Sequence, residues 1–238
     1  MIASLPWFTD LDDALAEARR TRRPVLSLRL LGRLDEELSC ANSRFFRKLL
    51  YPDPRINKLL REGFVLHWQS LRPVPLVTID FGDGRIIRRT LTGNSVHLVL
   101  SPDGRAVDAL PGLFAPNVFL ELLVEARSFA LADRRELARM HARAARRPVI
   151  ELPPSRAVAA SRIAAAKHVL EAPLLRAVMT DLDRDTAQNL ELHRRLHEAF
   201  AAGVAWPDLE AFVAWIYAEL FVMPLDDAAL GLDVPDPF

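Results

Sequence analysis

Two short apolar runs joined by a helical stretch place the strongest limit on the fold of this chain. Residues 25–31 (Val-Leu-Ser-Leu-Arg-Leu-Leu) lie between Pro24 and Gly32. Residues 64–68 (Phe-Val-Leu-His-Trp) follow Gly63. Runs of this length, bounded by turn residues, predict strands. A helical crossover between two strands brings them together in parallel. The sequence therefore predicts an α/β protein built on a central sheet.

Turn signals divide the rest of the first half into short elements. Asp83-Gly84 lies between two β-branched runs, which predicts a hairpin, and Ser101-Pro-Asp-Gly104 predicts a second one. We expect residues 95–100 in the central sheet and residues 106–110 at its edge. The other elements expected here are helices over 10–22, 43–50, 54–61 and, with a break, 116–146, and an inserted hairpin over 77–81 and 85–90.

The second half of the chain has only helical patterns. Pro148, Pro153 and Pro154 indicate a linker. Residues 1–147 are therefore predicted as one domain, including its long C-terminal helix, and residues 148–238 as an all-α module. The short linker and the apolar helix faces predict that this module packs on the first domain through the helix after residue 116. Its expected helices cover 155–171, 173–180, 183–202 and 207–222.

Composition excludes several classes of function. Lys+Arg and Asp+Glu are balanced at 31 each, so no net field attracts nucleic acid or an anionic membrane. No apolar run approaches the roughly 18 residues of a membrane span, and the N-terminus lacks the pattern of a signal peptide. The single cysteine excludes an intrachain disulfide and a multi-cysteine metal site. We expect a cytoplasmic protein.

Three features, in this order, resemble thioredoxin-like domains of bacterial proteins. They are Trp7 before an amphipathic helix and the strand entry Arg23-Pro-Val-Leu26, then Cys40-Ala-Asn-Ser43, then the segment Gly93–Gly104. Several strings also resemble an uncharacterised bacterial group labelled thioredoxin family, with a Cys-x-x-Ser motif. The resemblance covers about the first half of the chain. It implies a thioredoxin-like sheet flanked by helices, to which the hairpin and the helical module are added.

The resemblance makes Cys40 and Ser43 the candidate catalytic pair. Thioredoxins place a nucleophilic cysteine at this helix N-terminus, where the helix dipole favours thiolate, and a second cysteine resolves the mixed disulfide. Ser43 occupies the second position, so dithiol turnover within the chain is excluded. Cys40 alone can still form mixed disulfides with glutathione or a protein. The alternative is that Cys40 is a small buried apolar side chain.

Further residues are expected to face a substrate at the same place. Ser95 falls where thioredoxins carry a cis-proline, and Asn42, Asn94 and His97 should lie near Cys40. The change of both landmarks, at Ser43 and Ser95, indicates loss of redox turnover. For His97, the interpretation as a partly buried side chain with a hydrogen-bonded ring is preferred to a role as base.

One helix of the second half carries a polar stripe. Asp185, Asn189, His193 and His197 recur at steps of four residues. His193 and His197 would lie on adjacent turns, as in many zinc sites. No third ligand can be assigned from the sequence, so a polar stripe at a domain interface is the preferred interpretation.

Taken together, these observations predict a thioredoxin-like interaction or scaffold protein without dithiol turnover. The first alternative is a monothiol redox protein that uses Cys40, and the second is a metal-binding helical module. We expect a protein without enzymatic activity and without a cofactor. Its expected partner is a protein or a thiol-bearing small molecule, with no nucleic acid and no membrane. The sequence does not predict an oligomeric state.

Overall fold

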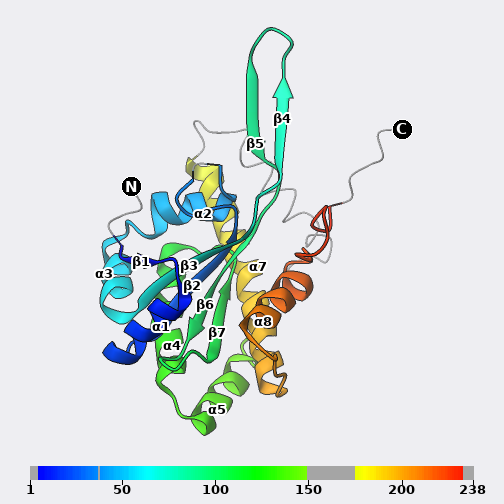
Figure 1. Cartoon of the computed structure of the whole chain (residues 1–238). Helices are drawn as coiled ribbons and strands as arrows, with labels where there is room; N and C mark the ends of the chain where they lie inside the picture. Colours follow the sequence, from blue (N-terminus) through cyan, green and yellow to red (C-terminus); the bar gives the residue numbers. More distant parts are fainter. Residues whose placement is uncertain (1–4, 37, 149–174, 233–238) are drawn as a thin grey trace.

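The computed structural model describes residues 5–36, 38–148 and 175–232, and a five-stranded mixed sheet lies at its centre (Figure 1). The strand order is β1-β3-β2-β6-β7. β2 pairs in parallel with β3, which confirms the predicted crossover, and antiparallel with β6. β7 is an edge strand, as predicted, whereas β1 at the other edge was not predicted. The strands are β1 (Trp7–Phe8), β2 (Val25–Leu31), β3 (Val65–Arg72), β6 (Ser95–Leu100) and β7 (Ala106–Pro111).

Aspartate caps open several of the helices. Asp10, Asp53 and Asp133 each accept hydrogen bonds from backbone N–H groups of the first helical turn that follows. Asp133 also explains the predicted break after residue 116, because a new helix begins behind it. The helices of the first half are α1 (Leu11–Thr21), α2 (Ala41–Phe45), the π-helical turn η1 (Phe46–Leu50), α3 (Pro54–Gly63), α4 (Pro116–Leu131) and α5 (Arg134–Ala144).

Two helix predictions were wrong in detail. The helix expected from residue 43 begins at Ala41, with Cys40 as its N-cap residue. The helices expected over 173–180 and 183–202 form one continuous helix, α7 (Leu175–Ala201), because no proline or glycine interrupts it. The last elements are α8 (Leu209–Trp215) and the π-helical turn η3 (Ile216–Leu220). The helix expected over 155–171 lies outside the described residues.

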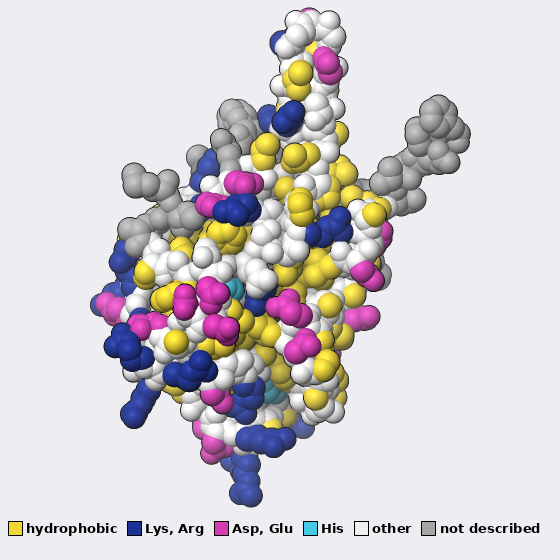
Figure 2. Space-filling model, in the orientation of Figure 1, with side chains coloured by type: hydrophobic (Ala, Val, Ile, Leu, Met, Phe, Trp, Pro, Cys, Tyr) yellow, Lys and Arg dark blue, Asp and Glu magenta, His cyan; other side chains and the backbone are white. Residues whose placement is uncertain are grey.

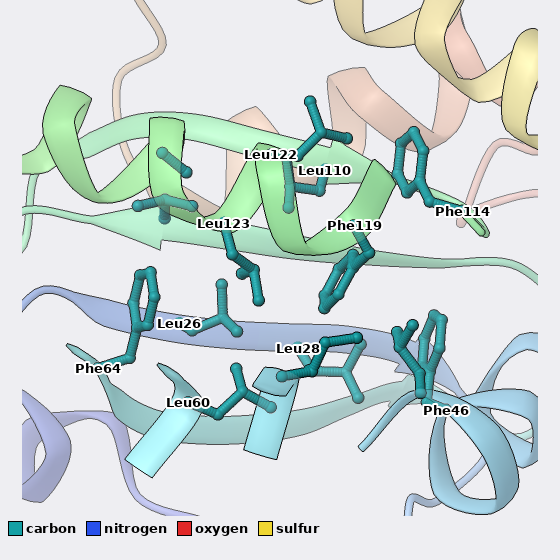
Figure 3. Packing of buried hydrophobic residues seen from close by; sticks show 14 of the residues in the cluster. Leu26, Leu28, Phe46, Leu60, Phe64, Leu110, Phe114, Phe119, Leu122 and Leu123 are labelled. Atoms are coloured by element: carbon teal, nitrogen blue, oxygen red, sulfur yellow. The ribbon is translucent and has the colours of Figure 1, made fainter. Parts of the chain in front are cut away.

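Helices cover both faces of the sheet, and the central strand β2 is buried along its whole length. On the first face, α2, η1, α3 and α4 pack against β2 and β3. Figure 3 shows Leu26 and Leu28 of β2 surrounded by Leu60 of α3 and by Phe119 and Leu123 of α4. The apolar alternation of β2 produces this arrangement, since side chains two residues apart point to the same face.

The second face is covered by α1 and by the C-terminal helices. Phe212, Ile216 and Tyr217 share a buried cluster with Val25 of β2 and Leu98 of β6. α7 lies beside α5 and β7. The segment after residue 175 thus contributes to the same core as the sheet. The proposed domain boundary at 147/148 borders residues that the structure does not describe, and it stays a prediction.

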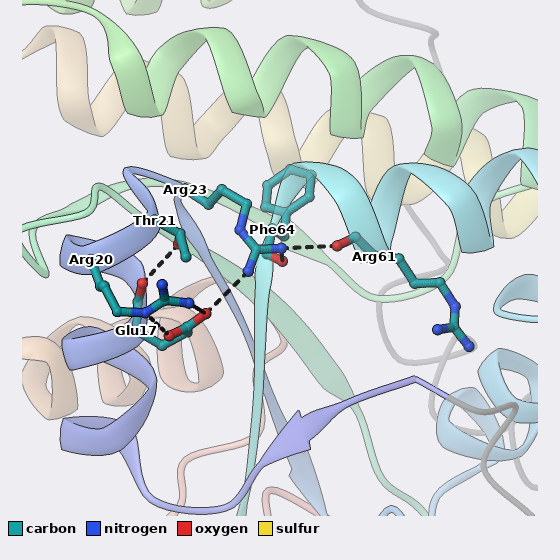
Figure 4. Close-up of polar contacts among 6 residues, drawn as sticks. All are labelled: Glu17, Arg20, Thr21, Arg23, Arg61 and Phe64. Atoms are coloured by element: carbon teal, nitrogen blue, oxygen red, sulfur yellow. Dashed lines mark hydrogen bonds and ion pairs between the residues drawn. The ribbon is translucent and has the colours of Figure 1, made fainter.

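A salt-bridged arginine fixes the start of β2. Arg23 donates hydrogen bonds to the backbone oxygens of Arg61 and Phe64, and its guanidinium also contacts Glu17 of α1 (Figure 4). Arg22 just before it adopts a left-handed conformation, which ends α1. The chain therefore turns from α1 into the sheet beside the end of α3.

The predicted hairpin is present and stands away from the sheet (Figure 1). It consists of β4 (Leu76–Asp80) and β5 (Ile86–Thr90), which form a separate two-stranded antiparallel sheet. We call residues 76–90 the hairpin arm. As for membranes, no helix within the described ranges combines the length and the apolar character that a crossing needs.

Candidate functional site

Cys40 lies at the N-terminus of α2 and is completely buried. Burial raises the pKa of its thiol to about 11, although hydrogen bonds from the backbone N–H groups of Ser43 and Asn42 act in the opposite direction. The cost of placing an anion in the core outweighs the favourable helix end. At neutral pH the side chain is therefore a protonated thiol.

Ser43 is also buried, and its hydroxyl takes part in a different contact. Its Oγ donates to Oγ of Ser39 at 2.7 Å. Arg47 donates to the same Ser39 oxygen at 3.0 Å. The Cys-x-x-Ser element is thus locked into the first turns of the helix.

The segment 93–95 seals the thiol from the other side. Asn42 and Asn94 are joined by a side-chain hydrogen bond of 2.7 Å, and Asn94 Oδ1 also accepts from the backbone N–H of Ser95. A Cβ atom at Gly93 would lie 2.7 Å from Cβ of Cys40, so only glycine fits there. Asn94 thus lies beside Asn42, next to Cys40, and together with Gly93 it closes the site.

His97 points to the face of the sheet that is covered by α2, η1, α3 and α4. Its Nε2 lies 2.8 Å from the hydroxyl of Tyr51, and its ring packs between Phe46 and Phe119. Burial lowers the pKa of His97 to about 3. The ring is hydrogen-bonded, as expected, but it is fully buried and not partly so, and its partner is Tyr51 rather than Cys40.

A second group of polar side chains meets where β7, α5 and α7 come together. We call Asp108, His141, His193 and His197 the histidine cluster. Nε2 of His193 lies 3.0 Å from Oδ1 of Asp108, and Nε2 of His197 lies 3.9 Å from the same oxygen. The Nδ1 atoms of His141 and His197 are 2.9 Å apart. All four side chains are buried.

The charges of the cluster are set by burial and by mutual contact. Burial would raise the pKa of Asp108, but the attraction and the hydrogen bond of the neighbouring His193 hold it below its usual value. Burial lowers the pKa of His141 to about 4, and burial together with His193 lowers that of His197. At neutral pH, Asp108 is ionised, while His141 and His197 are neutral.

A small cavity opens beside the cluster. It has a volume of about 100 Å³, and both His193 and His197 line it. Arg147 and Arg194 also border it, paired with Glu125 and with Glu191, respectively. The cavity is large enough for water molecules next to the imidazoles.

The sequence pointed to His193 and His197 but missed Asp108 and His141. The available signal was a charged residue inside the apolar strand 106–110, because a buried carboxylate needs a partner. Arg29 in β2 is a similar case. Its guanidinium is buried under α8, and a terminal nitrogen lies 3.6 Å from Glu210 Oε1.

Neither a scan against protein-family models nor a search of curated proteins found a match for the chain.

Proposed function

We propose that this chain is a thioredoxin-like protein that has no thiol redox turnover and binds another protein through the hairpin arm. The thioredoxin-like interpretation is supported by the parallel β3–β2 pair and by Cys40 at the helix that follows β2. The burial of both Cys40 and Ser43 supports the loss of redox chemistry, because a buried thiol cannot reach and attack a substrate disulfide.

The exposed apolar surface of the hairpin arm is the observation that carries the binding proposal. Eleven large hydrophobic side chains are exposed in the described ranges, and five belong to the arm's 15 residues. Figure 2 shows hydrophobic side chains along the projecting arm. Concentrated apolar surface of this kind marks interaction sites. The five are Leu76, Val77, Ile79, Phe81 and Ile86.

The arm is also too small to be stable by itself. A lone two-stranded hairpin is marginal in water, because it has no second layer on which to bury its apolar face. Val77 and Ile79 lie on one face of the arm, opposite Arg89 and Ile87 of β5. A partner that covers this face would bury Val77 and Ile79 and fix the strands, whereas Leu76 and Ile86 lie on the other face.

The charges of the arm indicate the chemistry of the partner. Arg88 and Arg89 are exposed, whereas Arg85 is paired with Asp83, and Asp80 is the arm's other acidic residue. A groove with apolar walls and a carboxylate-bearing rim complements this surface. A second copy of the arm is a poorer complement, since edge pairing of two β5 strands would bring their arginines together.

The alternative of a monothiol redox protein meets a specific obstacle. Cys40 has no exposed surface, and burial holds the pKa of its thiol at about 11. Reaction with glutathione or a protein disulfide would first require α2 and the segment 93–95 to separate. The interaction role requires no such opening.

The test compares two double variants of the full chain. Val77→Thr/Ile79→Thr removes exposed apolar groups from one face of the arm while keeping strand propensity. Val124→Gln/Leu131→Gln is the matched control, because it removes two exposed apolar groups from α4. A partner is captured from cell extract, purified, and its Kd is measured for the wild type and both variants.

We expect the control to bind like the wild type and the arm variant to bind at least about 10-fold more weakly. Equal affinity of the arm variant for the purified partner, or no partner that binds stoichiometrically, would overturn the proposal. Sedimentation velocity tests whether the chain instead associates with itself through the arm. A dimer that is lost in the arm variant would show that the arm binds a second copy instead.

A further inference from the structure

The geometry of the histidine cluster fits the ligand spacing of a metal ion. One ligand atom from each of Asp108, His193 and His197 can be chosen so that all three lie within 4.8 Å of one another. Zn²⁺ binds imidazole nitrogen and carboxylate oxygen at about 2.0–2.2 Å, which puts neighbouring ligands of a tetrahedron about 3.3 Å apart. The observed separations of 3.0 and 3.9 Å from Asp108 Oδ1 lie on either side of this value.

Buried polar atoms without a hydrogen-bond partner in the cluster also favour a metal site. Asp108 Oδ2 and His197 Nε2 are buried, and neither has a hydrogen-bond partner among the described residues. Asp108 Oδ1, in contrast, accepts from the backbone N–H of Ala109 and faces His193. A buried polar atom without a partner costs free energy. A cation bound between Asp108 and His197 would satisfy both atoms.

His141 is placed to orient one of these ligands. Its Nδ1 lies 2.9 Å from Nδ1 of His197, so one of the two nitrogens carries the shared proton. With that proton on Nδ1 of His197, the His197 ring donates to His141, and the lone pair on Nε2 of His197 is free to bind an ion. Metal-binding histidines commonly donate their second ring N–H to a fixed acceptor in this way.

The environment suits a divalent transition metal. The donor set of two imidazoles and one carboxylate is typical of zinc and related ions, whereas Mg²⁺ and Ca²⁺ prefer oxygen ligands alone. Phe129 stacks on His197, and Phe200 stacks on His141, so apolar rings shield the cluster.

We propose that Asp108, His193 and His197 bind one divalent transition-metal ion of the zinc class, with His141 as a positioning residue. The ion joins β7 to α7. The cavity beside His193 and His197 provides room for water as a further ligand. The sequence indicated His193 and His197 as weak metal candidates, but not the third ligand, because its carboxylate comes from the sheet and not from the helical segment.

The experiment uses the full chain, stripped of metal by a chelator. Zn²⁺ is titrated by calorimetry, and Co²⁺ is added in parallel because its visible spectrum reports the coordination geometry. Bound metal is counted after exhaustive dialysis. We expect one ion per chain, a higher thermal midpoint with Zn²⁺, and a Co²⁺ spectrum of four- or five-coordinate type.

Variants then assign the ligands. His193→Gln and Asp108→Asn should weaken Zn²⁺ binding at least about 100-fold. His141→Gln should weaken it by about 10- to 100-fold, the range expected for a group behind the ligands, without changing the number of imidazoles bound to the metal. His67→Gln is the matched control, because His67 is also buried but is hydrogen-bonded to Ser27.

X-ray absorption of the wild-type zinc complex keeps the test decisive when a variant fails to fold. Scattering from two imidazoles and one or more oxygen ligands supports the proposal. Absence of stoichiometric binding at 100-fold excess over a micromolar protein concentration would overturn it, and Asp108, His141, His193 and His197 would then form a metal-free hydrogen-bonded network. Unchanged binding in His193→Gln would overturn it as well. Neither result depends on the hairpin arm.

Discussion

Oδ1 of Asp108 lies 3.0 Å from Nε2 of His193, although the two residues are 85 positions apart in the chain. Asp108 belongs to the edge strand β7, and His193 belongs to α7. Both side chains are buried, and each supplies the other with a polar contact from a distant part of the chain. This contact and the apolar cover supplied by α8 and η3 tie the C-terminal segment to the sheet.

A split protein tests this dependence. Residues 1–147 produced alone should aggregate or lack cooperative unfolding, because Val25 and Leu98 would lose the cover of Phe212 and Ile216. Residues 175–238 alone should be largely unfolded. Co-expression should yield a 1:1 complex in size-exclusion chromatography. A monomeric fragment 1–147 with a cooperative thermal transition would contradict the expectation and favour an independent first domain.

Buried histidines should make the protein sensitive to acid. Burial lowers the pKa of His97 to about 3, and burial with the charge of Arg29 lowers that of His67 to about 4. The pKa of His141 is likewise lowered to about 4. An unfolded histidine has a pKa of about 6.5. Between these values the unfolded chain binds more protons than the folded one, so acid favours unfolding.

Stability should therefore be fully present above about pH 6.5 and decline as the pH falls toward 3. Each such histidine contributes a slope of up to about 1.4 kcal/mol per pH unit. Urea unfolding at a series of pH values measures the slope, and His97→Gln should reduce it. The lowered pKa of Asp108 also makes the free energy of unfolding fall at low pH, since its stabilising charge is lost there. A free energy of unfolding that is flat between pH 7 and 4 would refute this account.

Cys40 should be unreactive in the native protein. Because its thiol is buried and its pKa is about 11, alkylation near pH 7.5 should be at least about 100-fold slower than in denaturant. The protein should not reduce insulin, and Ser43→Cys should not confer this activity, since residue 43 is buried as well. Fast native alkylation that increases between pH 6 and 8 would instead favour the monothiol alternative.

The ion pair of Arg29 and Glu210 should contribute little to stability. The Arg29 side chain is fully buried, whereas that of Glu210 is 62% exposed, so solvent screens their attraction. The three guanidinium nitrogens have no hydrogen-bond partner in the part of the chain that the structure describes. Burial accordingly lowers the pKa of Arg29, with Glu210 acting against it.

Glu210→Gln should change the free energy of unfolding by less than about 1 kcal/mol. Arg29→Met, which keeps the volume and removes the buried charge, should be neutral or stabilising. Arg29→Ala should be clearly destabilising, because it leaves a cavity between the sheet and α8. Chemical denaturation of the three variants checks the order. A large loss of stability in Arg29→Met would show that the charge itself holds α8 on the sheet.

Local sequence patterns determined the secondary structure and the main strand pairing. The apolar runs of β2 and β3, bounded by Pro24, Gly32 and Gly63, specify strands that are buried on both faces. Helix caps such as Asp133 and turn pairs such as Asp83-Gly84 act within a few residues, so their effect can be predicted without the fold. Dithiol turnover could also be excluded without the fold, because the chain has one cysteine and Ser43 stands at the second position of the motif.

The surroundings of these residues depend on how distant elements pack in the fold. The sequence placed His193 and His197 on one helix face, but it could not reveal that Asp108 and His141 lie beside them. Contacts over such separations depend on how whole elements pack, and no local preference encodes their partner. The state of Cys40 depends on tertiary packing too. At a helix end that would activate an exposed thiol, Cys40 stays protonated, because Gly93 and Asn94 close over it and remove it from water.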